Sequence, residues 1–246
     1  RFKKFYFEFP TINLGLDISR MKFRDEFIED FRPRLEKAFK EMDELEAGGI
    51  ANPDENRMVG HYWLRNSQLA PTTEIRDSIN KAITMIETFS SEVHKGIITG
   101  ERGPFEHLLV VGIGGSALGP QFVSKALSQP MEDKLQAWFI DNTDPDGIDH
   151  IKCKLANLLG NTLVIVISKS GGTKETRNGM LEMQAAYKSA GLDFANHSVA
   201  ITGEGSTLDQ IAESEGWLRR FPMWDWVGGR TSETSSVGLL PAALQG

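Results

Sequence analysis

The sequence is poor in the features that mark secreted, membrane or metal-binding proteins. Cys153 is the single cysteine among 246 residues, so no disulfide can form within the chain, and we expect a cytoplasmic protein, with a plastid as the alternative. No apolar run reaches the roughly 18 residues that a membrane helix needs, and no signal peptide is visible, so we expect no membrane partner. The five histidines are scattered without metal-ligand spacing, so we expect no metal site.

Positive charge is also scarce. The chain has 27 Lys and Arg against 34 Asp and Glu, a net charge of −7 at neutral pH. Nucleic-acid backbones require clustered cations, so we expect no nucleic-acid partner. Hydrophobic residues make up 40% of the chain, enough for a sizeable core. The chain begins at Arg1 without a methionine and ends at Gly246 after an apolar helical pattern, so we expect it to be part of a longer protein.

Residues 1–105 are predicted to form a helical amino-terminal region. Between Ile18 and Leu45 apolar residues recur about every fourth position, which indicates an amphipathic helix that Pro33 should break or kink. A second helix is predicted from Thr73 to Val93, with Thr72 or Thr73 as its cap.

Residues 106–246 are predicted to form one α/β domain. Apolar runs alternate with helical patterns, and runs that are apolar throughout are typical of a parallel sheet covered on both faces, so we predict a doubly wound parallel sheet. The expected strands are 108–113, 135–141, 163–168 and 198–202. The expected helices are 117–127, 173–189, 207–213 and 234–244. We expect the last of these helices to be capped by Thr231 or Ser232 and interrupted by Pro241.

The first loop after a strand is Gly112-Ile113-Gly114-Gly115-Ser116. A strand, a glycine loop and a helix start together present backbone N–H groups and the positive end of a helix dipole, which attract a phosphate. We expect Gly115 and Ser116 to bind one through their amides and the serine hydroxyl. The loop also fits G-x-G-x-x-A, and Asp141 ends the next strand, so a dinucleotide-dependent oxidoreductase is an alternative.

The second loop is richer in hydroxyl groups. Three of them lie within six residues, separated by two glycines that let the backbone approach an oxyanion. We predict that this is the principal phosphate site, where Lys169 contributes either its charge or only its amide. The binding residues expected here are Ser168, Lys169, Ser170, Gly171, Gly172 and Thr173.

A third segment, residues 221–232, places Gly228 and Gly229 before Arg230. Paired glycines allow a tight turn that presents the guanidinium, which is always charged and stabilises negative charge developing on oxygen. A surface arginine after a turn is the alternative. Trp224 and Trp226 are expected to make core or domain contacts.

Together these segments resemble the glucose-6-phosphate isomerase (phosphoglucose isomerase) family. The resemblance rests on Val111–Ser116, on Ser168–Thr176 and most specifically on Asp225–Gly238, in the order found in the amino-terminal half of that family. The Ser-Gly-Gly-Thr and Gly-Gly-Arg-Thr sequences are similar to its bacterial and plastid branch.

The resemblance implies a sugar-isomerase (SIS) fold that recurs twice in the full protein. It also implies that the full protein is an enzyme of glycolysis and gluconeogenesis, which interconverts glucose 6-phosphate and fructose 6-phosphate through an enediolate. It implies no cofactor, a hexose-phosphate substrate and a homodimer in the full-length protein. Arg230 would be the catalytic arginine that stabilises the enediolate. The family's base, ring-opening histidine and late lysine match nothing before residue 246, so we expect this chain alone to be nearly inactive. A non-catalytic sugar-phosphate-binding module remains the second interpretation.

Overall fold

A computed structural model describes all residues, 1–246, and divides into two compact units, 1–44 and 45–246. The first unit contains a short helix, α1 (Phe2–Phe5), and an antiparallel hairpin of β1 (Tyr6–Phe9) and β2 (Leu14–Asp17), joined by the 3₁₀ turn η1 (Pro10–Ile12). Phe5 is its single buried residue. The long helix α2 (Phe27–Glu46) begins in this unit and continues through Pro33, which does not break it as predicted.

The second unit opens with small elements and a long helix. A two-stranded ladder joins β3 (Ile50–Asn52) to β4 (Arg57–Met58), and a 3₁₀ turn, η2 (Ser67–Leu69), follows. Helix α3 (Thr73–His94) starts with the Thr72 hydroxyl accepting a hydrogen bond from the Ile75 amide at 3.3 Å, which confirms the predicted cap.

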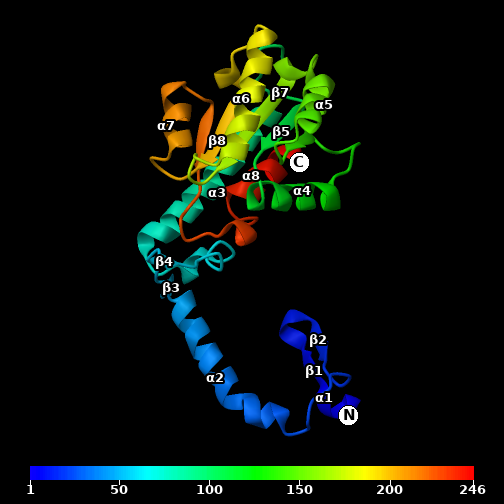
Figure 1. Ribbon diagram of the computed structural model, residues 1–246, viewed down its shortest axis with the longest axis vertical. Helices are drawn as coiled ribbons and strands as arrows, with labels where there is room; N and C mark the ends of the chain where they lie inside the picture. The colour runs from blue at the N-terminus through cyan, green and yellow to red at the C-terminus, as the bar shows by residue number, and fades with distance from the viewer. The chain divides into compact units, whose positions relative to one another are not determined.

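A parallel sheet of five strands forms the centre of this unit, in the order β6-β5-β7-β8-β9 (Figure 1). Every neighbouring pair is parallel, which confirms the predicted sheet. β5 and β7 are central strands, and β7 is buried along its whole length. The strands are β5 (His107–Val111), β6 (Gln136–Ile140), β7 (Thr162–Ser168), β8 (Ser198–Thr202) and β9 (Arg219–Pro222).

Helices cover both faces of the sheet, and strand residues alternate between two cores. Leu109, Val111 and Val164 pack with residues of α5, α6 and α7 on one face. Leu108 and Val110 pack with residues of α3 and α8 on the other. The helices are α4 (Gly115–Leu127), α5 (Pro145–Leu155), α6 (Lys174–Ser189), α7 (Thr207–Ser214) and α8 (Ser236–Gln245), with 3₁₀ turns η3 (Leu159–Asn161), η4 (Phe194–His197) and η5 (Gly229–Thr231).

Several predictions need correction. The sequence reading missed β9 and α5, and it missed the short strands of residues 1–105, which are not helical throughout. Helix α8 begins at Ser236, is capped by Ser235 rather than by Thr231 or Ser232, and continues through Pro241. The compact units divide after Glu44, and α3 shares a core with the sheet.

Candidate functional site

The two glycine loops leave the sheet side by side. β5 and β7 are hydrogen-bonded neighbours, with Val111 opposite Val166 in the ladder. Residues 112–116 follow β5, and residues 168–173 begin at the last residue of β7, so both loops lie at the carboxyl edge, where open parallel sheets bind ligands.

In the first loop a left-handed glycine starts the helix. Gly114 has φ of +56° and precedes α4, which has no side-chain cap. The Ser116 amide already donates to the carbonyl of Ile113 at 3.1 Å, so this amide is engaged in the loop itself. The Ser116 hydroxyl makes no hydrogen bond within the chain and remains available to a ligand.

The second loop is held together by its own hydroxyl groups. The buried Ser168 hydroxyl accepts from the Gly171 amide at 3.2 Å and lies 3.5 Å from the Thr173 hydroxyl. The Ser170 hydroxyl accepts from the Gly172 amide at 3.1 Å. Thr173 occupies the cap position of α6, yet its side chain makes no capping hydrogen bond. The loop therefore gathers three hydroxyls at a helix start without using them to cap it.

The two loop helices lack the side-chain cap that four other helices of residues 45–246 have. Helices α3, α5, α7 and α8 each start with a side-chain oxygen that accepts a backbone N–H, from Thr72, Asp144, Ser206 and Ser235. Helices α4 and α6 start without one. Because the first N–H groups of a helix have no partner inside the helix, the start of α6 keeps donors for an anion. At α4 the amides of Ser116, Ala117 and Leu118 already donate to backbone carbonyls, which leaves the Gly115 amide.

The third segment lies directly on the first loop. A side chain at Gly115 would collide with the backbone of Gly229, so only glycine allows the approach. The Ser232 hydroxyl donates to the Gly229 carbonyl at 2.9 Å and lies 3.4 Å from the Gly115 carbonyl. The turn that carries Arg230 is thereby fixed beside the start of α4.

Lys169 ties the second loop to the third segment. Its ammonium donates to the Val227 carbonyl at 2.6 Å and to the Asp225 carbonyl at 3.3 Å. Burial lowers the pKa of this half-buried lysine. Of the two roles expected for Lys169, these contacts favour the one in which the side chain points away and only the backbone amide is left for a ligand.

Arg230 is the free cation of the arrangement. Its side chain is exposed and forms no ion pair or hydrogen bond within the chain. Behind it, Trp226 packs on the buried Trp63 with ring centroids 5.2 Å apart and on Trp224 at 4.9 Å. These tryptophans support the segment from within the core, as the sequence predicted.

Asp141, the acidic residue that the dinucleotide alternative requires, forms hydrogen bonds with neighbouring side chains. Asp141 accepts hydrogen bonds from the side chains of Gln121 at 2.7 Å and Asn142 at 2.8 Å.

The buried His197 ring bonds to the Thr162 carbonyl and the Glu101 amide, and no group of three possible metal ligands occurs in the chain.

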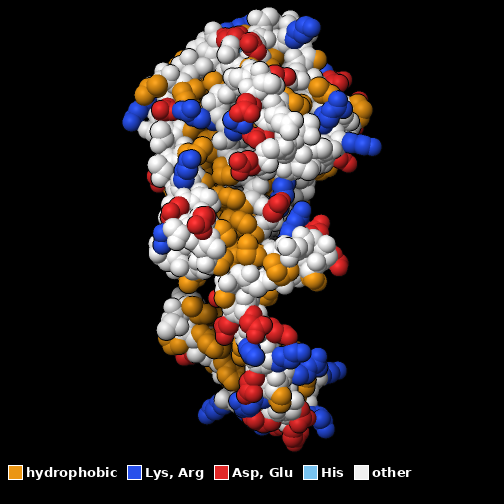
Figure 2. All heavy atoms as spheres, turned by 90° about the vertical axis from the view of Figure 1, so that its left-hand side faces the viewer, with side chains coloured by type: hydrophobic (Ala, Val, Ile, Leu, Met, Phe, Trp, Pro, Cys, Tyr) orange, Lys and Arg blue, Asp and Glu red, His pale blue; other side chains and the backbone are white.

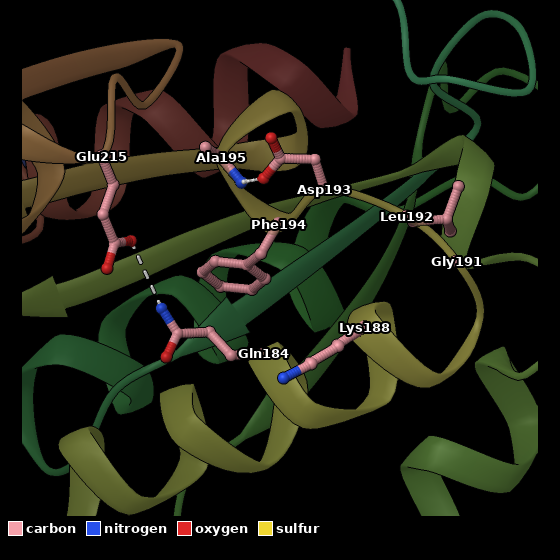
Figure 3. Close-up of a pocket in the computed structure, with 8 residues that line it drawn as sticks. All are labelled: Gln184, Lys188, Gly191, Leu192, Asp193, Phe194, Ala195 and Glu215. Carbon is pink, nitrogen blue, oxygen red and sulfur yellow. Dashed lines mark hydrogen bonds between the residues drawn. The ribbon is translucent and has the colours of Figure 1, made fainter.

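A separate hollow of about 610 Å³ lies away from these loops (Figure 3). It is bounded by the end of α6 and by η4, which leads into the start of β8, so it lies at the amino edge of the sheet. In Figure 3 the Gln184 amide reaches Glu215 at 3.4 Å, and the Ala195 amide donates to Asp193 at 3.0 Å. Its two carboxylates thus accept hydrogen bonds from neutral groups, and none of its residues belongs to the glycine loops.

Figure 2 shows one face of the protein with its side chains coloured by type. Basic and acidic side chains are interspersed there, without a continuous basic patch. No helix is long and apolar enough to cross a membrane.

A parallel α/β sheet with two glycine loops and an arginine turn at its carboxyl edge defines a domain of the sugar-isomerase class. The profile of the phosphoglucose isomerase family matches residues 17–246. The chain therefore belongs to the phosphoglucose isomerase family.

Individual relatives agree with this assignment. A glucose-6-phosphate isomerase of Geobacter sulfurreducens is 60% identical over 235 residues, covering 95% of this chain and 44% of the relative. One from Synechococcus is 58% identical over 238 residues, covering 96% and 44%. The crystal structure of a glucose-6-phosphate isomerase from Chlamydia trachomatis superposes with a TM-score of 0.79 at 28% identity, covering 94% of this chain and 44% of that one. The chain spans about half the length of the curated relatives it matches.

Two residues shape the site in ways that the sequence did not predict: Ser232 was expected only as a possible helix cap, and Glu233 was given no role. Ser232 bonds both glycine-containing segments, and Glu233 is half-buried beside them. Glu233 is the single charged residue between Arg230 and Gly246, a signal that was available in the sequence.

Proposed function

We propose that this chain is the phosphate-binding half of an aldose–ketose isomerase that interconverts glucose 6-phosphate and fructose 6-phosphate. The observation that carries the proposal is the convergence of two uncapped helix starts and a free arginine at one edge of the sheet. The family's printed name supplies the substrate pair.

The phosphate is assigned to the second loop, with the first loop beside it. Ser170 and Thr173 offer hydroxyls and the start of α6 offers amides, while Ser168 orders the loop through Gly171. Gly172 lets the backbone approach the oxyanion. Gly115 and Ser116 contribute from the neighbouring helix start. Three hydroxyls and successive amides can surround a phosphoryl group without a metal.

Arg230 is assigned to the enediolate. A fixed guanidinium beside the sugar favours the negative charge that develops on oxygen when a proton leaves carbon. The base is assigned to the part of the relatives that this chain does not span, and a positioned base contributes about 10²–10⁴-fold to the rate. We therefore propose that this chain binds sugar phosphate without turning it over, and that the longer protein acts as a cytoplasmic homodimer.

Binding tests this function directly. We expect fructose 6-phosphate to change the tryptophan fluorescence saturably, because Trp224 and Trp226 lie close in sequence to Arg230, and to bind more tightly than inorganic phosphate. Thr173→Ala with Ser170→Ala should weaken binding at least tenfold, since hydrogen bonds to charged groups are worth about 1.5–3 kcal/mol each.

Ser189→Ala is the matched control. Ser189 is a hydroxyl residue at the far end of α6 that bonds only to the Ala185 carbonyl, at 2.8 Å. Unchanged affinity in the double variant would refute the phosphate site, and a response to NAD in place of the sugar phosphate would favour the dinucleotide alternative.

A further inference from the structure

Helix α4 carries two glycines on one face, and both lie against residues 229–233. Gly115 and Gly119 are four residues apart and therefore lie one above the other. Gly115 meets the backbone of Gly229, and the place of a side chain at Gly119 is taken by the carboxyl of Glu233. The face of α4 is thus shaped to hold residues 229–233 along one turn.

The Glu233 carboxyl is enclosed from the opposite side as well. A side chain at Gly238, in the first turn of α8, would also collide with it. Two glycines on two helices therefore make room for a single carboxyl. One of its oxygens, Oε2, is fully buried and has no hydrogen-bond partner.

Few charges are available to this carboxyl. α4 carries Lys125 as its single titratable side chain, α8 carries none, and the segment that precedes the carboxyl carries Asp225 and Arg230. Burial is the cause that raises the pKa of Glu233 to about 7. The carboxyl is therefore neutral below this pH and becomes a buried, unpaired anion above it, a costly state.

We propose that Glu233 is a positioning residue whose carboxyl wedges between α4 and α8 and fixes the Arg230 turn against the first glycine loop. It touches no substrate. It acts through Gly229 and Ser232, which contact Gly115. Ionisation of the wedge loosens the turn, so the order of the arginine depends on pH near neutrality. The link to catalysis rests on the proposed isomerase function, whereas the positioning itself does not.

Hydrogen exchange of the 246-residue chain tests the positioning without any ligand. Amide exchange of residues 229–235 is measured at pH 6 and pH 8 and corrected for the intrinsic rates. With a pKa of about 7 in the closed turn and 4.5 in the open one, the opening constant should be about tenfold larger at pH 8 than at pH 6. Glu233→Gln, a neutral side chain of the same shape, should abolish this difference. In the Glu233→Ala variant the amides of residues 229–235 should exchange rapidly at both pH values.

Glu132→Gln is the control, since Glu132 is an exposed carboxylate in the loop after α4. Exchange that is equal in the parent chain, Glu233→Gln and Glu233→Ala at both pH values would overturn the proposal. A fructose 6-phosphate titration of the same samples separates the two claims. Absence of binding by the parent chain with the pH-dependent exchange present would refute the proposed function alone.

Discussion

At the scale of single residues, the site is built by side chains that face inward. Lys169 looks like a phosphate ligand in the sequence, yet its ammonium lies 2.6 Å from the Val227 carbonyl. Ser168 likewise bonds its own loop. The Ser116 hydroxyl and the exposed Arg230 guanidinium, by contrast, have no partner within the chain and remain for a ligand beside the hydroxyls of Ser170 and Thr173.

Lys169→Met should therefore destabilise the protein and not only weaken anion binding. The substitution keeps the hydrophobic stem and removes both hydrogen bonds to the 225–227 carbonyls. Leaving partly buried carbonyls unpaired costs about 1–3 kcal/mol. Chemical denaturation should show this loss, with Lys174→Met, an exposed lysine five residues later, as the control. Equal stability of both variants would contradict the inward role of Lys169.

Glu233→Gln should stabilise the chain, and more so as pH rises. The pKa of Glu233 is raised from 4.5 to about 7 in the folded state. The folded protein therefore holds this proton longer than the unfolded chain, and stability is lost as pH rises from 4.5 to 7. The difference of 2.5 pKa units corresponds to a loss of at most about 3 kcal/mol in the free energy of unfolding above pH 7. The positive end of the α8 dipole stabilises the carboxylate and reduces this loss.

Urea denaturation at pH 4 and pH 8 measures this difference. We expect the variant and the parent chain to be nearly equal at pH 4 and the variant to be more stable at pH 8. A stability gap that does not change with pH would show that burial does not shift this carboxyl.

The candidate site was only partly predictable at this scale. Local sequence identified both glycine loops and the arginine, because strand, glycine and hydroxyl follow one another within a few residues. The roles of Ser232 and Glu233 depend on α4, which is more than 100 residues away in sequence. Such contacts leave no local pattern beyond one charged residue in an uncharged stretch.

At the scale of elements, the strongest signals gave the right structure. Runs such as Leu163–Ser168 are apolar throughout, and they form strands buried on both faces. The edge strand β9 carries Arg219 and Arg220 and contains Pro222, so it lacks the apolar run that marked the others. Pro33 and Pro241 were expected to interrupt helices, but each helix continues through its proline.

Gly115→Ala tests the contact between two elements, α4 and the turn η5. Alanine ordinarily stabilises a helix relative to glycine, but here a methyl group would collide with the Gly229 backbone. We expect a net loss of about 1–3 kcal/mol, as for overpacking in a core, together with weaker anion binding.

Lys125→Ala, an exposed position on the same helix, should leave stability nearly unchanged. Thermal unfolding followed by circular dichroism compares the two variants. A stabilised Gly115→Ala protein would mean that the turn does not rest on α4.

At the scale of the whole molecule, the order of the strands in the sheet brings the residues of the candidate site together. Strand order β6-β5-β7-β8-β9 makes β5 and β7 neighbours, although α4, β6 and α5 separate them in sequence. This order brings the two loops together. The segment after β9 contacts the first loop through Gly229 and is bound by Lys169 of the second loop. The chain itself carries the loops and the arginine, while its relatives are about twice as long.

The central claim is that a sugar phosphate binds at this carboxyl edge. Its most direct test is a titration of the ¹⁵N-labelled chain with fructose 6-phosphate, followed by amide chemical shifts. The account predicts saturable shifts concentrated at residues 114–117, 168–175 and 228–232, with none around the hollow of Figure 3. Shifts at that hollow, or no shift at the two glycine loops at saturating sugar phosphate, would contradict it.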